Sequence, residues 1–311
     1  MSEYHTPVLL AESISALLAN PDGMYADVTF GGGGHTAAIL SRLSGSGSVI
    51  AFDRDSDAIG GALKDPRLTL VHNNFRFIEN YAEQLRRERN ADSPAIFDGI
   101  LADLGVSSHQ FDTAERGFSF RFEDAPLDMR MNREASLTAA DVVNRYDEQE
   151  LERILRLYGE VDNPRNVARL IIAARTEKAL ASTGDLDRAV ARILPKGAEH
   201  KVLAKLYQAL RIEVNQEMRS LEKFLEGAAA CLKPDGRLVV ITYHSIEDRM
   251  VKNFIKSGNT DGRIEKDAFG NASAPLEAVN RKPIVPQESE IAGNTRARSA
   301  KLRIARRRTC A

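Results

Sequence analysis

The stretch that decides the fold is Tyr25-Ala26-Asp27-Val28-Thr29-Phe30-Gly31-Gly32-Gly33-Gly34-His35. It begins as a short β-type run, passes through four consecutive glycines and continues into a helical pattern. Because glycine has no Cβ, such a turn leaves backbone N–H groups accessible to a ligand at the helix N-terminus. The stretch therefore predicts a nucleotide-binding loop at the carboxyl end of a strand.

Apolar runs that follow this loop predict a parallel sheet of the doubly wound α/β type. Its further parallel strands are expected at residues 48–53, 68–72, 96–103 and 237–243. Residues 257–295 have the composition of a long loop. The alternating run 300–304 predicts a last strand, which we expect to be antiparallel and to lie at the edge of the sheet.

Residues 104–236 separate the fourth and fifth of these strands, whereas a βαβ crossover needs only about thirty residues. Most of this stretch must therefore be an insertion. A capping-box pattern that begins at Thr138 is typical of the helices that fill it. We expect a discontinuous sheet domain, residues 1–112 and 206–311, that carries an inserted helical domain, residues 113–205.

The composition is that of a soluble globular protein, with 43% apolar and 28% charged residues among 311. The first thirty residues lack the pattern of a signal peptide, and no apolar run is long enough to span a membrane. We therefore expect a cytoplasmic protein with no membrane contact. The two cysteines, Cys231 and Cys310, have no metal-ligand spacing.

Basic residues crowd the end of the chain, although the formal net charge is only −1. They are Arg296, Arg298, Lys301, Arg303, Arg306, Arg307 and Arg308. Such a segment can neutralise the phosphates of a nucleic acid and release counterions. A frayed and solvated terminus accounts for the same pattern, so both interpretations stay open.

Polar side chains follow the expected strands where a nucleoside would lie. Asp53 ends the second strand about twenty residues beyond the glycines, where a carboxylate can accept both ribose hydroxyls. A solvated turn acid is the alternative. Phe75 follows the third strand and could meet a purine face, although a lone phenylalanine is more often part of the core. Asp103 ends the fourth strand.

The glycine pattern discriminates between nucleotide ligands. A dinucleotide fingerprint needs a further glycine three residues after the second, and a Walker loop needs a lysine; this chain has neither. The pattern fits S-adenosylmethionine better than a dinucleotide or a nucleoside triphosphate. The glycine loop would admit its amino-acid end, Asp53 its ribose and the loop at Phe75 its adenine, while Asp103 would lie near its cationic sulfur.

Seven blocks of the sequence resemble the signature of the MraW/RsmH methyltransferases. They are the glycine stretch at Asp27–His35, Asp103-Leu-Gly-Val-Ser-Ser-x-Gln110, Arg116-Gly-Phe-Ser-Phe120, Pro126-Leu-Asp-Met-Arg-Met131, Gln208-Ala-Leu-Arg-Ile212, His244-Ser-x-Glu-Asp-Arg249 and Arg296-Ala-Arg-Ser-Ala-Lys-Leu-Arg303. The resemblance runs from His5 to Arg303. It departs from the family pattern at Ala125, Val161, Tyr207 and Tyr243, the last two of which replace phenylalanine.

The resemblance implies a Rossmann-like class I methyltransferase sheet with an inserted helical domain for substrate recognition. It also implies an S-adenosylmethionine-dependent enzyme that methylates the exocyclic N4 of a cytidine in the decoding region of 16S ribosomal RNA. The substrate would be folded RNA or an assembled small ribosomal subunit. The cofactor contacts that it implies are Gly33, Gly34, His35, Asp53, Phe75, Asp103 and Gln110. The oligomeric state, including a homodimer, stays open.

The sequence does not identify the group that accepts the proton from N4. Many amino-group methyltransferases have an Asp/Asn-Pro-Pro-aromatic motif after the fourth strand, and here that position reads Asp103-Leu104-Gly105-Val106. Asp103, His109 and His244 are candidates for a proton acceptor, and so is solvent. Two other classes of function also remain open, a nicotinamide oxidoreductase on the same sheet and a non-catalytic RNA-binding factor.

Overall fold

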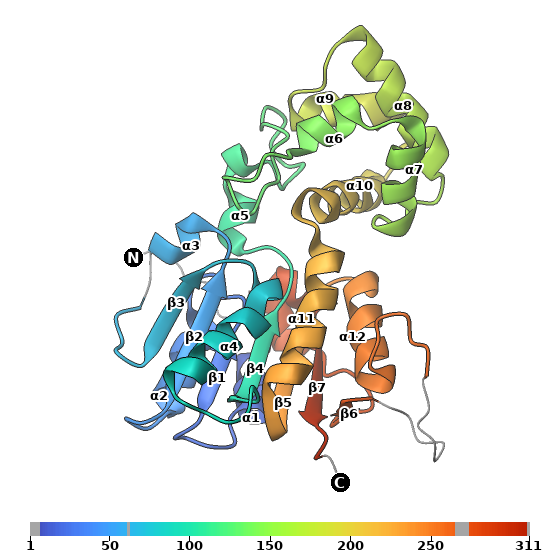
Figure 1. The fold of residues 1–311 in the computed structure, drawn as a ribbon. Helices are drawn as coiled ribbons and strands as arrows, with labels where there is room; N and C mark the ends of the chain where they lie inside the picture. Colours follow the sequence, from blue (N-terminus) through green and yellow to red (C-terminus); the bar gives the residue numbers. More distant parts are fainter. Residues whose placement is uncertain (1–6, 61–62, 265–273, 310–311) are drawn as a thin grey trace. The chain divides into compact units, whose positions relative to one another are not determined.

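The computed structural model describes residues 7–60, 63–264 and 274–309 (Figure 1). The chain divides into two compact units. Unit 1 comprises Met1–Gly105 and Met218–Ala311, and unit 2 is Val106–Glu217. The helical insertion expected at residues 113–205 falls inside unit 2, whose ends lie several residues further out on both sides.

Among the described residues, unit 1 forms a seven-stranded sheet in the order β3-β2-β1-β4-β5-β7-β6. The strands are β1 (Met24–Asp27), β2 (Ser48–Asp53), β3 (Leu68–His72), β4 (Phe97–Asp103), β5 (Leu232–Thr242), β6 (Leu276–Ala278) and β7 (Lys301–Arg307). Strands β1 to β5 pair in parallel, and β7 is antiparallel to both β5 and β6. The predicted α/β class and the five predicted parallel strands are confirmed, and β5 starts earlier than expected.

Helices cover both faces of this sheet (Figure 1). The helices of unit 1 are α1 (Leu10–Leu17), α2 (Gly34–Arg42), α3 (Ser56–Gly60), α4 (Ile78–Glu88), α11 (Glu217–Cys231), α12 (Ser245–Ser257) and α13 (Glu288–Gly293). Buried side chains of α4, α11 and α12 share one core with the sheet, whereas those of α1 and α2 share a second core. A sheet with an apolar core on each face is the doubly wound arrangement that its continuous apolar strands predict.

The C-terminal part of unit 1 differs from the prediction. Strand β7 is antiparallel as expected, but β6 lies outside it, so β7 is not an edge strand. The stretch expected to be a loop contains β6 and α13, while residues 265–273 of it lie outside the described part. Strand β5 starts at Leu232, earlier than the expected residue 237, and so includes the Lys233-Pro234-Asp235-Gly236 segment. A three-residue strand such as β6 is too short to show a period in the sequence.

Unit 2 is helical and has its own apolar core. Its helices are α5 (Ser108–Asp112), α6 (Ala139–Arg145), α7 (Glu148–Leu157), α8 (Pro164–Glu177), α9 (Thr183–Val190) and α10 (Glu199–Asn215). The predicted capping box at Thr138 is present, and Asp147 forms another at the start of α7. No helix in the described part of either unit is both long and apolar enough to cross a membrane.

Candidate functional site

Three carboxylates end three neighbouring parallel strands of unit 1. Asp27 ends β1, Asp53 ends β2 and Asp103 ends β4. The register places β1 between the other two strands (Figure 1), and because the three acids end these parallel strands, they lie along the carboxyl edge of the sheet. In open α/β sheets this carboxyl edge is where ligands bind.

The glycine loop joins β1 to α2 and has two residues in the left-handed region, Gly31 at φ 51° and Gly33 at φ 76°. A Cβ on Gly33 would lie 2.9 Å from the Phe30 ring, and one on Gly34 would lie 2.3 Å from Pro7 Cγ. At Gly31 the nearest atom to such a Cβ would be 3.9 Å away, so this glycine borders open space. Gly33 and Gly34 are therefore required by the packing of the chain itself, and Gly31 leaves room for a ligand.

Asp27 holds the loop in place and was not among the predicted site residues. Its side chain is fully buried and accepts hydrogen bonds from Thr36 Oγ1 at 2.6 Å and from the Thr29 N–H at 3.1 Å. Thr29 Oγ1 in turn accepts one from the Asp103 N–H at 2.7 Å. This network ties the loop to α2 and to the end of β4.

Asp53 touches the glycine loop directly. Its Oδ2 accepts a hydrogen bond from the Gly31 N–H at 2.8 Å, and its Oδ1 accepts one from the Asp55 N–H at 2.8 Å. Burial raises the pKa of this carboxyl group above its ordinary value. Because each carboxylate oxygen can accept two hydrogen bonds, Asp53 keeps capacity for the two hydroxyls of a ribose.

Asp103 lies between a phenol and an imidazole. Its Oδ1 accepts a hydrogen bond from Tyr243 Oη at 2.7 Å, and its Oδ2 lies 3.7 Å from His35 Nδ1. The Asp103 side chain is 23% exposed, and burial raises its pKa to about 6, against the opposing effects of His35 and Tyr243. Tyr243 is a site residue that sequence reasoning missed. Its departure from the family pattern was the only signal.

His35 and Phe75 have contacts within unit 1 that account for their burial. His35 Nε2 lies 3.2 Å from the Val8 carbonyl oxygen, and only 6% of the side chain is exposed. Phe75 packs edge-on against Phe224, with ring centroids 5.4 Å apart. This contact agrees with the core interpretation of Phe75, while its partial exposure leaves ring surface for a ligand.

The remaining candidates are helix-capping or exposed residues. Gln110 is buried in unit 2 and forms the capping box of α5 with Ser107. His109, in the same helix, is exposed. In unit 1, His244 caps α12, and its Nε2 lies 3.0 Å from Glu247 Oε1. The structure therefore brings Gly33, Gly34, His35, Asp53 and Asp103 together through the loop and strand ends of unit 1, and it places Gln110 and His109 in unit 2.

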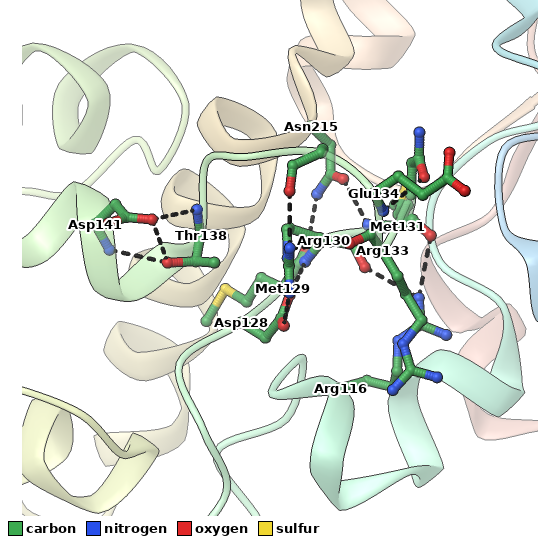
Figure 2. Close-up of polar contacts among 12 residues, drawn as sticks. Arg116, Asp128, Met129, Arg130, Met131, Arg133, Glu134, Thr138, Asp141 and Asn215 are labelled. Carbon is green, nitrogen blue, oxygen red and sulfur yellow. Dashed lines mark hydrogen bonds and ion pairs between the residues drawn. The ribbon is translucent and has the colours of Figure 1, made fainter.

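The segment of unit 2 that joins α5 to α6 is aromatic and basic, and buried polar side chains fix its backbone (Figure 2). Arg116, 3% exposed, donates to the carbonyl oxygens of Arg130 and Met131 at 3.0 and 3.1 Å. Asn215 donates to the Met129 carbonyl at 2.7 Å and accepts from the Met131 N–H at 2.8 Å. Figure 2 shows both side chains directed at this loop, so hydrogen bonds hold its backbone at residues 129–131.

The basic C-terminal segment is ordered through most of its length. Arg303 forms two hydrogen bonds with Asp248, at 2.6 and 3.0 Å, and Arg306 pairs with Glu277. Because residues 301–307 form β7, the interpretation as a frayed terminus is wrong for them. Arg298 and Arg308 are exposed.

Comparison with known proteins gives one consistent family. The MraW methylase family profile matches residues 2–308. The ribosomal RNA small subunit methyltransferase H of Bacteroides fragilis is 53% identical over 305 residues, which cover 98% of each chain. The proteins of the same name from Bacteroides thetaiotaomicron and Flavobacterium johnsoniae are each 52% identical, over 98% and 97% of each chain.

Proposed function

Because this chain belongs to the MraW methylase family, we propose that it is an S-adenosylmethionine-dependent methyltransferase of small-subunit ribosomal RNA. More specifically, its substrate is the exocyclic N4 of a cytidine in the decoding region of 16S ribosomal RNA. The observation that carries the proposal is the family match over residues 2–308, which includes both the glycine loop and unit 2.

The residues at the carboxyl edge of the sheet have the chemistry that S-adenosylmethionine requires. Gly31 borders open space at the helix N-terminus, which suits the amino-acid end of the cofactor. Asp53 would accept the ribose hydroxyls, and Asp103 would lie near the cationic sulfur. The resemblance to the family supports five further cofactor contacts, which we propose at Gly33, Gly34, His35, Phe75 and Gln110.

When bound, S-adenosylmethionine supplies a methyl carbon that is electrophilic because its sulfur is cationic. The protein has to hold the amine nitrogen in line with that carbon, about 3 to 3.5 Å away. Cytosine N4 is a weak nucleophile because its lone pair is delocalised into the ring, so an acceptor for its proton assists the transfer. Of the candidate proton acceptors, Asp103 has a pKa of about 6 and is therefore mostly ionised at neutral pH. His244 is less suited to this role, because its Nε2 already pairs with Glu247.

The cytosine must be unstacked, since pairing buries N4 in a duplex. We propose that unit 2 and the exposed basic residues of the C-terminal segment bind the RNA in its folded or ribosomal form. Binding to isolated small subunits should then weaken as the salt concentration rises, because phosphate contacts release counterions. Affinity that is independent of salt would contradict this part of the proposal.

The deciding experiment is transfer of tritiated methyl groups into unmethylated small ribosomal subunits, followed by digestion to nucleosides. We expect the label in N4-methylcytidine. Label in another nucleoside would overturn the proposed position, and no transfer would favour a non-catalytic RNA-binding factor. Asp53→Asn should lose most cofactor affinity. Asp22→Asn, which alters an exposed carboxylate bonded to Ser46 before β1, should transfer normally.

The nicotinamide alternative conflicts with the observed sheet. Dinucleotide-binding sheets run in the order 3-2-1-4-5-6, whereas here the antiparallel β7 lies between β5 and β6. Thermal unfolding separates the two ligands, since only a ligand that binds the folded state raises the transition temperature. We expect S-adenosylmethionine to raise it and NAD to leave it unchanged.

A further inference from the structure

Asp103 is surrounded by ionisable groups from four elements of unit 1. Tyr243 follows β5, His35 is in α2, Asp27 ends β1 and Glu247 is in α12. The side chain of Asp103 thus lies in a small network that only the fold assembles, because Tyr243 is 140 residues away in the sequence.

The two oxygens of this carboxylate have different surroundings. Oδ1 receives a hydrogen bond of 2.7 Å from the Tyr243 phenol, which is short enough to be charge-assisted. Oδ2 lies 3.7 Å from His35 Nδ1, beyond hydrogen-bond distance. Oδ1 is therefore held by a hydrogen bond, whereas Oδ2 has only the longer ion-pair contact with His35 and can still approach a cation.

Tyr243 is held through its backbone as well as through its side chain. Its backbone N–H donates to Glu247 Oε2 at 2.9 Å, and its ring lies against Gly105, where an added Cβ would be 3.4 Å from Tyr243 Cδ2. Gly105 has φ 103°, a conformation that favours glycine, and a Cβ there would be in van der Waals contact with the Tyr243 ring. A phenol held in this way has little freedom to leave its partner.

We propose that Tyr243 is a positioning residue for the cofactor: its phenol fixes Asp103 through Oδ1 and leaves Oδ2 to face the positively charged sulfur. This inference rests on the proposed function. It assigns to Tyr243 a role in cofactor binding that acts through Asp103 and requires no direct contact with the substrate.

The charges around Asp103 make its pKa a quantity that reports on the Tyr243 hydrogen bond. Burial raises the pKa of Asp103, and the negative charges of Asp27 and Glu247 raise it further, while His35 and the Tyr243 hydrogen bond lower it. Burial and the neighbouring Asp103 carboxylate also raise the pKa of Tyr243, so the phenol stays a donor at every working pH. Loss of the phenol O–H should therefore raise the pKa of Asp103.

The test is Tyr243→Phe, which removes the donor and keeps the ring. The Asp103 carboxyl group is titrated by carbon NMR in the ligand-free protein, with its signal assigned through Asp103→Asn. We expect the midpoint to rise by about 0.5 to 1 unit in the variant, as for one charge-assisted hydrogen bond. Affinity for S-adenosylmethionine should fall about two- to fivefold at pH 6 and be unchanged at pH 8, following the ionised fraction of Asp103.

Tyr25→Phe is the matched control, because Tyr25 is fully buried and its phenol, like that of Tyr243, donates a hydrogen bond, in this case to the Asn20 carbonyl at 2.8 Å in the turn before β1. It should lose some stability and leave both the Asp103 midpoint and the pH profile of affinity unchanged. An unchanged midpoint in Tyr243→Phe would overturn the inference. So would a shifted midpoint without any change in affinity at pH 6. If the wild-type protein binds no S-adenosylmethionine at all, the proposed function fails, and the NMR titration still shows whether the Tyr243–Asp103 bond exists.

Discussion

At the scale of the residue, Asp103 shows how a carboxylate of the candidate site is held at an energetic disadvantage. Its pKa rises from 3.8 to about 6 on folding, so between these values the folded state binds more protons than the unfolded state. Stability therefore falls as the pH rises through this window, and the full loss is present above pH 6. A group that destabilises its own fold is typical of a binding site.

This predicts that Asp103→Asn stabilises the protein at pH 8 by about 1 to 3 kcal/mol while weakening cofactor binding. The asparagine side chain can still accept from Tyr243. Denaturant unfolding followed by circular dichroism at pH 8 and pH 4 measures the effect, and the gain should vanish at pH 4. Asp22→Asn should show no gain, because hydrogen bonds from Ser44 and Ser46 lower the pKa of Asp22. Equal gains in both variants would contradict the explanation.

Gly34 gives a second prediction at the same scale. A Cβ there would lie 2.3 Å from Pro7 Cγ, and a proline ring cannot rotate away. We expect Gly34→Ala to destabilise the protein by about 1 to 3 kcal/mol and to reduce affinity for S-adenosylmethionine at least tenfold. Gly45→Ala, at a position where an added Cβ meets nothing within 4 Å, should leave both the stability and the affinity for S-adenosylmethionine unchanged within experimental error. Thermal shift and ligand titration of the two variants give the answer.

At the scale of the element, β7 shows that basic residues near the terminus stabilise the sheet, whether or not others among them contact a nucleic acid. Arg303 is 9% exposed and points from β7 to Asp248 in α12, so it joins a strand to the helix that covers it. Removing one partner of a buried pair is damaging because the other charge loses its main compensation. Without Arg303, Asp248 would keep only the longer contact with Lys301, whose Nζ lies 3.5 Å from Asp248 Oδ2.

We therefore predict that Arg303→Ala lowers the free energy of unfolding by about 3 kcal/mol. Arg298→Ala, at an exposed position in the turn before β7, should change it by less than about 0.5 kcal/mol. Urea unfolding of the two variants is the measurement. If both variants lost the same stability, the division of this segment into structural and exposed arginines would be wrong.

At the scale of the whole molecule, the chain divides into two compact units. Residues 106–217 are continuous in sequence and enclose their own apolar cluster, whereas unit 1 needs both ends of the chain to complete its sheet. We predict that a fragment of residues 106–217 folds cooperatively by itself and shows no thermal shift with S-adenosylmethionine, while the full chain does. Circular dichroism on heating tests this. A fragment without a thermal transition would show that unit 2 depends on the rest of the chain.

The sequence by itself determined the α/β class, the five parallel strands, the glycine loop and the position of Asp53 and Asp103 at the ends of two strands. These features are local, because periodicity, caps and glycine turns act over a few residues. Only the tertiary structure decided that β7 lies between β5 and β6, that Arg303 pairs with Asp248 and that Tyr243 bonds to Asp103. A hydrophobic pattern records that a residue is buried and does not record its partner. Partners separated by tens of residues are chosen by strand order and register, which are set by packing of the whole sheet.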